Sequence, residues 1–216
     1  MRSETVFRQC VRKACMFRFP APDGDDFPCP KCGSATNVVA LIPHHEVDPD
    51  VIHTDRMNEL VLEAGLDNIR SVLNIGSIFR TADGVGMQHI HLYGICPSPA
   101  HPHMKKTALG ADQMIPWTQH WDGLRAVREK KKEGFCVWAL EKNRTSTNLF
   151  VTPLPEHGRK LLLIVGNENN GIDPGILMES EQVVHLPMVG IKESLNVANA
   201  FAIAVYWLRF GNPTGG

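Results

Sequence analysis

The run Leu161–Val165, five consecutive apolar residues, constrains the fold of this 216-residue chain more than any other feature. Such a run is typical of a strand that is buried on both faces of a parallel sheet. Further strand and helix patterns alternate around it. Strands are expected at 60–66, 89–93, 135–140 and 183–186, helices at 75–84, 124–133, 176–180 and 196–210, and a long loop at 94–110. This alternation predicts an α/β fold with a mostly parallel sheet.

The N-terminal segment contains four of the six cysteines, in the pattern C-x4-C-x13-C-x2-C: Cys10, Cys15, Cys29 and Cys32. In an intracellular protein this spacing favours zinc over disulfides. Zinc binds four thiolates tetrahedrally, and a tight turn such as Cys29–Gly33 supplies two of them. We therefore predict that residues 1–43 form a small module around a structural zinc ion. Unliganded thiols are the alternative, and His44 or His45 could substitute as ligands.

The same segment interleaves aromatic and basic residues. Residues 1–20 hold five basic side chains against Glu4, and between them lie Phe7, Phe17 and Phe19. Aromatic rings beside arginine suit stacking on unpaired bases, but the rings could equally form the core around the metal, which we favour. Residues 44–57 break all periodicity and are predicted to be a linker to a second domain, 58–212. A second basic run at 125–132 fits either phosphate contacts or a solvated helix face.

Several function classes are excluded. No apolar stretch reaches the roughly 18–20 residues of a membrane span, and no secretory signal is evident, so we expect a cytoplasmic protein without a membrane partner. The G-x-G-x-x-G fingerprint of dinucleotide-binding proteins is missing. Gly166 and Gly171 have the spacing of the two glycines in a phosphate-binding loop. Ile172 and Asp173 stand where such a loop has Lys and then Ser or Thr, which argues against ATP or GTP hydrolysis. The remaining two cysteines, Cys96 and Cys136, are interpreted as small core residues.

Three polar loops, at 68–84, 165–171 and 186–196, carry the unusual chemistry. The first leads into a helix whose start suits a phosphate; read simply, Asn74 is an N-cap and Arg80 a surface cation. The second follows the buried strand, where ligands of open α/β sheets bind, and Gly166 would let a ligand approach the backbone. In the third, Ser194 or Asn196 could cap the last helix.

The last helix, 196–210, is apolar nearly all round. A helix that is apolar on every face must be buried on every face. In a chain of this size, a C-terminal helix achieves that by packing against a partner subunit. The sequence therefore predicts a homodimer.

Taken together, the three loops resemble the SpoU (TrmH) family of RNA ribose 2′-O-methyltransferases, within the SPOUT superfamily. The matching motifs are N-x-G-S-I-x-R-T-A-D-x-x-G at 74–86, G-N-E-N-x-G at 166–171 and L-P-M-x-G-x-x-x-S-L-N at 186–196. The resemblance covers roughly residues 58–212, and the cysteine-rich segment is not part of it.

This resemblance implies a C-terminal trefoil knot, although true knots are otherwise essentially absent. It also implies S-adenosylmethionine as cofactor, RNA (tRNA or rRNA) as partner, and a homodimer formed through the knot and the last helix. By position in the motifs, the cofactor pocket is expected to be lined by Leu140, Gly166, Leu186, Met188, Leu195 and Asn196.

A ribose 2′-OH is a poor nucleophile, so its proton must leave as it attacks the methyl group. The resemblance assigns the activating role to Arg80. Because a guanidinium stays protonated, Arg80 is expected to hold the adjacent phosphate and to stabilise a developing alkoxide. Asn74 and Ser194 would orient Arg80 and the RNA, and Glu168 would position the loop or be structural. An RNA base methyltransferase on the same fold and a non-catalytic RNA-binding protein remain alternatives.

Overall fold

A computed structural model of the chain describes residues 5–24, 27–42, 60–155 and 160–211. The chain divides into two compact units, Met1–Ile52 and His53–Gly216. We call them the cysteine arm and the α/β unit. The predicted linker 44–57 lies outside the described residues, and so do His44 and His45.

The cysteine arm is a three-stranded antiparallel sheet in the order β2-β1-β3, formed by Thr5–Cys10 (β1), Arg18–Pro22 (β2) and Thr36–Leu41 (β3). Its buried apolar residues are few: Val6, Ala21, Cys10 and Cys29. None of the three phenylalanines is buried. Phe7 and Phe19 are half-buried and Phe17 is exposed, so the interpretation that they form the core around the metal is wrong.

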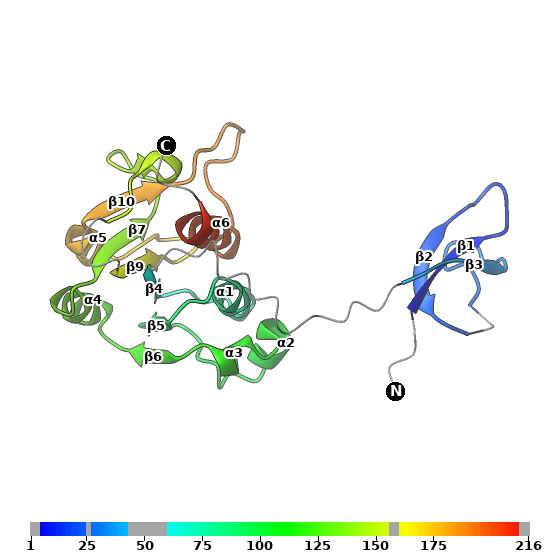
Figure 1. Cartoon of the computed structure of the whole chain (residues 1–216), viewed down its shortest axis with the longest axis horizontal. Coiled ribbons are helices and arrows are strands. Elements are labelled where there is room, and N and C mark those ends of the chain that lie inside the picture. Colours follow the sequence, from blue (N-terminus) through cyan, green and yellow to red (C-terminus); the bar gives the residue numbers. More distant parts are fainter. Residues whose placement is uncertain (1–4, 25–26, 43–59, 156–159, 212–216) are drawn as a thin grey trace. The chain divides into compact units, whose positions relative to one another are not determined.

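The α/β unit contains a seven-stranded sheet in the order β6-β5-β4-β9-β7-β10-β8 (Figure 1). Every strand pairing in it is parallel. The predicted α/β class with a parallel sheet is confirmed. The strands are Val61–Asp67 (β4), His89–Tyr93 (β5), Trp117–His120 (β6), Cys136–Leu140 (β7), Thr147–Asn148 (β8), Lys160–Val165 (β9) and Gln182–His185 (β10).

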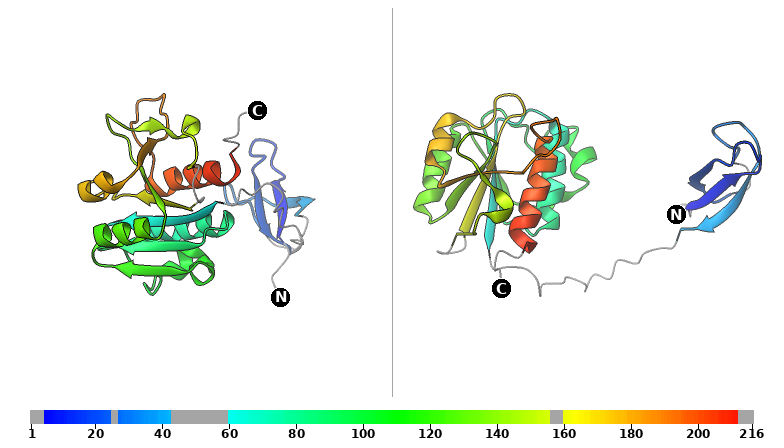
Figure 2. Two further views of the ribbon diagram at one scale, coloured as in Figure 1. Left: turned by 60° about the vertical axis from the view of Figure 1, so that its left-hand side comes forward. Right: turned by 90° about the horizontal axis from the view of Figure 1, so that it is seen from above.

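Helices cover both faces of this sheet, as the view from above shows (Figure 2). On one face α1 packs against α2, α3 and α6, and on the other α4 packs against α5. The helices are Val72–Gly84 (α1), Met104–Ala108 (α2), Ala111–Met114 (α3), Gly123–Lys132 (α4), Pro174–Glu179 (α5) and Val197–Phe210 (α6), and a short 3-10 turn, η2, spans Leu149–Val151.

Strand β9 shows why the apolar run was so informative. Leu161, Leu163 and Val165 belong to the core on the α1 and α6 side. Leu162 and Ile164 belong to the core on the α4 and α5 side. Because successive side chains of a strand point to opposite faces, a strand between two helical layers needs apolar residues at every position, and β9 has them.

Two local predictions differ from the structure. Helix α1 begins at Val72, earlier than expected, because the Ser71 side chain accepts a hydrogen bond from the Asn74 backbone N–H and is the N-cap. Asn74 is therefore inside the first turn and is not the cap. The expected loop 94–110 contains helix α2, whose Met104 is fully buried beside α1.

The basic residues of α4 form a salt-bridged helix face. Arg125 pairs with Glu129, Arg128 with Glu179, Lys130 with Glu63 and Glu133, and Lys131 with Glu179 and Glu181. Their charges are locally balanced by carboxylates. The phosphate-binding alternative for residues 125–132 therefore loses its support, and the solvated-face interpretation holds.

Helix α6 is not buried on every face within the described chain. Its inner face packs on the core through residues such as Phe201 and Val205, whereas Ile203, Tyr206 and Phe210 are 41–48% exposed. Near its end, the buried Arg209 donates hydrogen bonds to the backbone oxygens of Val85 (2.9 Å) and Leu60 (2.7 Å). Through these hydrogen bonds Arg209 holds the end of the last helix against the C-cap residue of α1 and the residue before β4.

Strand β10 lies near one edge of the sheet. From there the chain runs to α6, which packs against α1 (Figure 1). The trefoil knot implied by the resemblance stays a prediction about this return. Among the described residues, no helix has both the length and the apolar character to cross a bilayer.

Candidate active site

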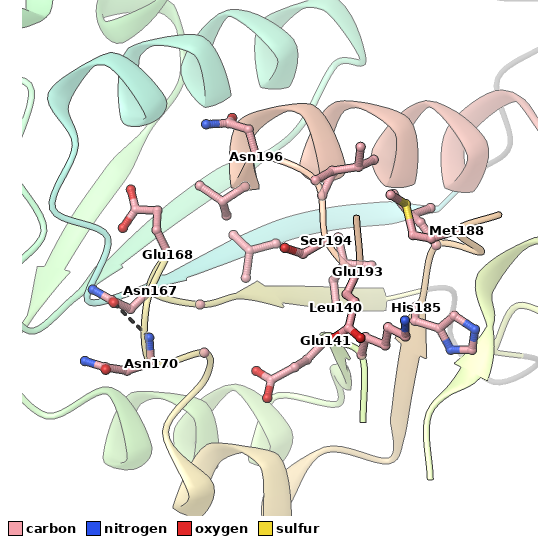
Figure 3. A pocket seen from close by; sticks show the side chains of 18 residues that line it. Leu140, Glu141, Asn167, Glu168, Asn170, His185, Met188, Glu193, Ser194 and Asn196 are labelled. Carbon is pink, nitrogen blue, oxygen red and sulfur yellow. Dashed lines mark hydrogen bonds between the residues drawn. The ribbon is translucent and has the colours of Figure 1, made fainter. Parts of the chain in front are cut away.

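A cavity of about 550 Å³ opens at the carboxyl ends of β7, β9 and β10. It is lined by all six residues that were expected to bind the cofactor: Leu140, Gly166, Leu186, Met188, Leu195 and Asn196. Ser194 and Glu168 also line it, and Figure 3 shows these side chains around one hollow. Segments that are far apart in the sequence therefore build a single site. Their roles in it stay predictions.

The loop after β9 is held in one conformation by Asn167. Its backbone exchanges two 3.0 Å hydrogen bonds with Gly171. Its side-chain oxygen accepts from the backbone N–H groups of Asn169 (2.9 Å) and Asn170 (3.2 Å), the latter drawn in Figure 3. Its amide nitrogen donates to the Asn68 carbonyl at 2.7 Å. The sequence analysis did not select Asn167, although the polar run between two glycines was the signal.

Gly166 has a structural reason to be glycine. A Cβ atom there would lie 2.6 Å from both the Gly171 oxygen and the Ile172 nitrogen. The close approach that excludes a side chain is thus made by the loop itself. This differs from our expectation that Gly166 serves to admit a ligand to the backbone, although Gly166 also lines the cavity.

Three motif residues from different elements are joined by side-chain hydrogen bonds. The Asn74 amide nitrogen donates to Glu168 Oε1 at 2.8 Å, and Asn74 Oδ1 accepts from the Asn196 amide at 3.1 Å. Asn196 is also the N-cap of α6, since its side-chain oxygen accepts from Ala198 and Asn199. This Asn74–Glu168–Asn196 network connects the starts of α1 and α6 to the loop after β9.

Arg80 lies apart from this network. It is exposed on α1, about 9 Å along the helix axis from Asn74 at 1.5 Å per residue, and it is not a lining residue of the cavity. Within residues 5–24, 27–42, 60–155 and 160–211, no side chain pairs with its guanidinium. Asn74 is engaged by Glu168 and Asn196, so the expected orientation of Arg80 by Asn74 and Ser194 has no contact to support it here.

Two carboxylates that the sequence analysis missed accept hydrogen bonds from the backbone that follows Gly171; Glu141 lines the cavity and Asp67 does not. Glu141, at the end of β7, accepts a 2.7 Å hydrogen bond from the Ile172 backbone and lines the cavity. Asp67, at the end of β4, accepts from Asp173 N and from the Asn68 amide, both at 2.7 Å. Burial raises the pKa of Asp67 above its ordinary value, and these two hydrogen bonds oppose that rise.

The cysteine arm holds a second candidate site. The Sγ atoms of Cys10, Cys15, Cys29 and Cys32 all lie within 4.8 Å of one another. Cys10 and Cys32 are 3.6 Å apart, and Cys15 and Cys29 are 3.8 Å apart. Four thiolates around one zinc ion at 2.3 Å would stand about 3.8 Å from each other. The four sulfur atoms therefore have the spacing of a tetrahedral metal site.

The fold and the cavity together define an α/β protein whose ligand site lies at the carboxyl ends of parallel strands. The model of the SpoU rRNA Methylase family matches residues 62–206. The chain therefore belongs to this family.

Known proteins resemble the chain over the α/β unit. A tRNA (guanosine(18)-2′-O)-methyltransferase of Aquifex aeolicus is 27% identical over 158 residues, covering 70% of this chain and 69% of that protein. A 23S rRNA (guanosine(2553)-2′-O)-methyltransferase of Bacillus subtilis is 31% identical over 144 residues, covering 67% and 56%. The chain spans about half the length of the uncharacterized tRNA/rRNA methyltransferases of Mycobacterium that it matches.

Among solved structures, an AdoMet-bound rRNA methyltransferase from Sinorhizobium meliloti is similar, with a TM-score of 0.63 and 26% identity. That match covers 67% of this chain and 54% of the other. The TrmH/SpoU tRNA-modifying enzyme of A. aeolicus shares the fold, with a TM-score of 0.64 over 72% of this chain and 77% of the other, at 24% identity.

Proposed function

We propose that the protein is an S-adenosylmethionine-dependent methyltransferase that modifies a ribose 2′-OH in tRNA or rRNA. The observation that carries the proposal is the single cavity at the carboxyl ends of β7, β9 and β10, which gathers residues of the second and third motifs. The Asn74–Glu168–Asn196 network ties the first motif to it. The names of the relatives support RNA as substrate, because they are tRNA and rRNA methyltransferases.

The lining of the cavity fits this cofactor. Leu140, Leu186 and Leu195 offer apolar surface for a planar base, and the cavity volume lies within the range of about 300–1,000 Å³ that is usual for such ligands. Glu141, Glu193 and His185 bring polar groups to the same hollow for an amino-acid or ribose moiety. When bound, the cofactor supplies a methyl group attached to a sulfonium sulfur. Once the methyl group is transferred, the rest of the cofactor is a neutral thioether, which is an excellent leaving group.

The chain's own residues would then position the ribose. Arg80, exposed and unpaired among the described side chains, would bind the phosphate beside the target nucleotide and stabilise negative charge on the attacking oxygen. The proton of the 2′-OH would pass toward that phosphate. Ser194, at the cavity, would hold the RNA backbone, and Glu168 would fix Asn74 and the loop. Most of the rate gain would come from such positioning.

The direct test is incubation with methyl-labelled S-adenosylmethionine and total bacterial RNA, followed by alkaline digestion. We expect label in alkali-resistant dinucleotides, because a 2′-O-methyl group blocks cleavage of the adjacent linkage. Arg80→Ala should reduce transfer at least about 100-fold and leave cofactor affinity nearly unchanged, whereas Arg125→Ala on α4 should behave as wild type. Label in alkali-sensitive mononucleotides would indicate base methylation, and binding without transfer would indicate a non-catalytic RNA-binding protein.

We also propose that the four cysteines hold a structural zinc ion. The spacing of their sulfur atoms supports this. So does the arm's small core, because a segment this short gains much of its folding free energy from a metal.

For the assembly we propose a homodimer that covers the exposed apolar face of α6, namely Ile203, Tyr206 and Phe210. Burying such a face against a second copy removes it from water. An RNA-modifying enzyme of this kind is expected in the cytoplasm.

A further inference from the structure

The sheet of the cysteine arm has two unlike faces. Direct partners in an antiparallel pair share a face, and the pairs Val6–Ala21 and Cys10–Thr36 place the buried residues on one side. On the other side lie the partners of Phe7 and Gln9: Arg18, Pro20, Asn37 and Ala40. We call these six residues the outer face. None of them is buried.

The outer face has an aromatic ring at its centre. Phe7 lies on β1, the middle strand, and is half-buried although no core covers it. The guanidinium carbon of Arg18 lies 5.6 Å from the centre of its ring. Gln9 and Asn37 stand in register beside each other and carry amide groups. A ring on a sheet surface, flanked by a guanidinium and amides, matches the way sheets bind unpaired bases, by stacking and edge hydrogen bonds.

Charge is distributed unevenly around this face. Three basic side chains lie at this end of the sheet, Arg12 and Lys13 in the turn between β1 and β2 and Arg18 as the first residue of β2. All three are exposed and have no carboxylate partner among the described residues. This contrasts with α4, where most of the basic side chains are paired with carboxylates. An unpaired basic turn at the edge of an aromatic face complements a phosphate backbone.

We propose that the outer face of the cysteine arm binds single-stranded RNA, with a base stacked on Phe7 and phosphates on Arg18 and the 11–17 turn. This inference rests on the proposed function, since it makes the arm a second contact with the RNA that the α/β unit would methylate. The four cysteines then serve to hold a small sheet rigid, so that its outer face is presented without ordering cost.

The test uses the full-length, zinc-loaded protein and a fluorescent single-stranded oligonucleotide of about 12 nucleotides, in the site-size range of such surfaces. Phe7→Leu removes the ring but keeps apolar volume, and should weaken binding about 10-fold, the loss of one stacked base. Arg18→Gln should weaken it and lower the slope of log affinity against log salt by about 0.7. The matched controls are Phe27→Leu, whose ring faces Arg8, and Lys31→Gln; both should bind as wild type.

The proposal is overturned if Phe7→Leu and Arg18→Gln bind the oligonucleotide as tightly as wild type at unchanged zinc content. It is also overturned if the controls lose as much affinity, or if Phe7→Leu alters only the oligomeric state, which would make the face a protein contact. Methyl transfer by the wild-type protein separates the two proposals. If the wild-type protein transfers methyl groups but the arm variants bind the oligonucleotide normally, only this inference is removed. If the arm variants bind the oligonucleotide more weakly but the wild-type protein transfers no methyl group, only the proposed activity is removed.

Discussion

The cysteine arm and the α/β unit differ in how much apolar surface they bury. In the α/β unit, apolar residues of a seven-stranded sheet pack against helices on both faces, and a strand such as β9 contributes to two cores at once. Among the described residues of the arm, the buried apolar residues are only Val6, Ala21 and two of the cysteines. Surface-to-volume scaling makes so small a core insufficient. The difference teaches that hydrophobic burial accounts for the order of one unit, whereas the other would need the metal that we propose for it.

The largest effect is expected from removing one metal ligand. Cys32→Ser should abolish stoichiometric zinc binding and unfold the arm, since the binding free energy of a structural zinc is folding free energy. Hydrogen exchange should then show protection lost over residues 5–42 and retained over β4 and β9. Cys136→Ser, outside the cluster, is the control. Wild-type protein purified without zinc, yet with a protected arm, would contradict the comparison.

A charge on the exposed face of α6 should next separate the subunits. Ile203→Glu would place a carboxylate in the interface that we propose, and analytical ultracentrifugation should show a monomer. The matched control is Met178→Glu, which changes a residue 88% exposed on α5 and should leave the dimer intact. A wild-type protein that sediments as a monomer at micromolar concentration would remove the dimer from the account.

The Asn74–Glu168–Asn196 network at the candidate active site predicts a smaller effect, confined to the α/β unit. Asn74→Ala breaks the bonds to Glu168 and Asn196 and should lower cofactor affinity and transfer about 10-fold, the value of one or two hydrogen bonds. Asn74→Asp should be worse, because it faces Glu168 with a like charge at the present 2.8 Å contact. Leu73→Ala, 68% exposed on the same helix turn, is the control. If Asn74→Asp retains full affinity, the network does not position the site.

The last effect is one on stability and not on binding, and it concerns the buried ion pairs on the α4 side of the sheet. Burial raises the pKa of Glu63, but hydrogen bonds from His91 (2.8 Å) and Lys130 (2.9 Å) outweigh it and hold that pKa below its ordinary value of 4.5. A carboxyl with a lowered pKa stabilises the fold above its ordinary pKa, and this contribution is lost as the pH falls through the folded value.

Glu63→Gln should therefore lower the free energy of unfolding of the α/β unit by about 1–3 kcal/mol at pH 7. The difference from wild type should shrink below pH 4.5. Denaturant titration monitored by tryptophan fluorescence measures both. The control Glu129→Gln, half-exposed in a pair with Arg125, should change stability by less than about 0.5 kcal/mol. A difference that persists unchanged at acid pH would show that the loss is one of packing.

Local sequence patterns predicted the parts of the molecule that local chemistry decides. Leu161–Val165 identified a strand buried on both faces, and the C-x4-C-x13-C-x2-C spacing identified four cysteines whose sulfur atoms lie together. Burial on both faces requires an unbroken apolar run, and the tetrahedral zinc site that we propose would require such a spacing. Long-range pairs left no such trace. Arg209 reaches Leu60 and Val85, and Glu63 meets Lys130 only after the sheet forms. The sequence analysis interpreted Asn74 as the N-cap of α1, whereas the cap is Ser71. The sequence could not separate the two because both residue types suit the cap position.

The candidate site was predicted only in part, because some of its contacts also join residues that are far apart in the sequence. The resemblance named six residues that line the cavity. Asn167 stands in the second motif but was not selected, and Glu141, just after β7, lies outside the motifs. Both hold the loop after β9 through hydrogen bonds. The motifs also paired Asn74 with Arg80, whereas the structure pairs it with Glu168 and Asn196. A one-dimensional motif does not tell which member contacts which.

The most direct test of the division between the two units is to measure two affinities on one sample, with and without its zinc. The account predicts that chelation weakens binding of single-stranded RNA and leaves the affinity for S-adenosylmethionine unchanged. A parallel loss of both affinities, or the loss of neither, would contradict it.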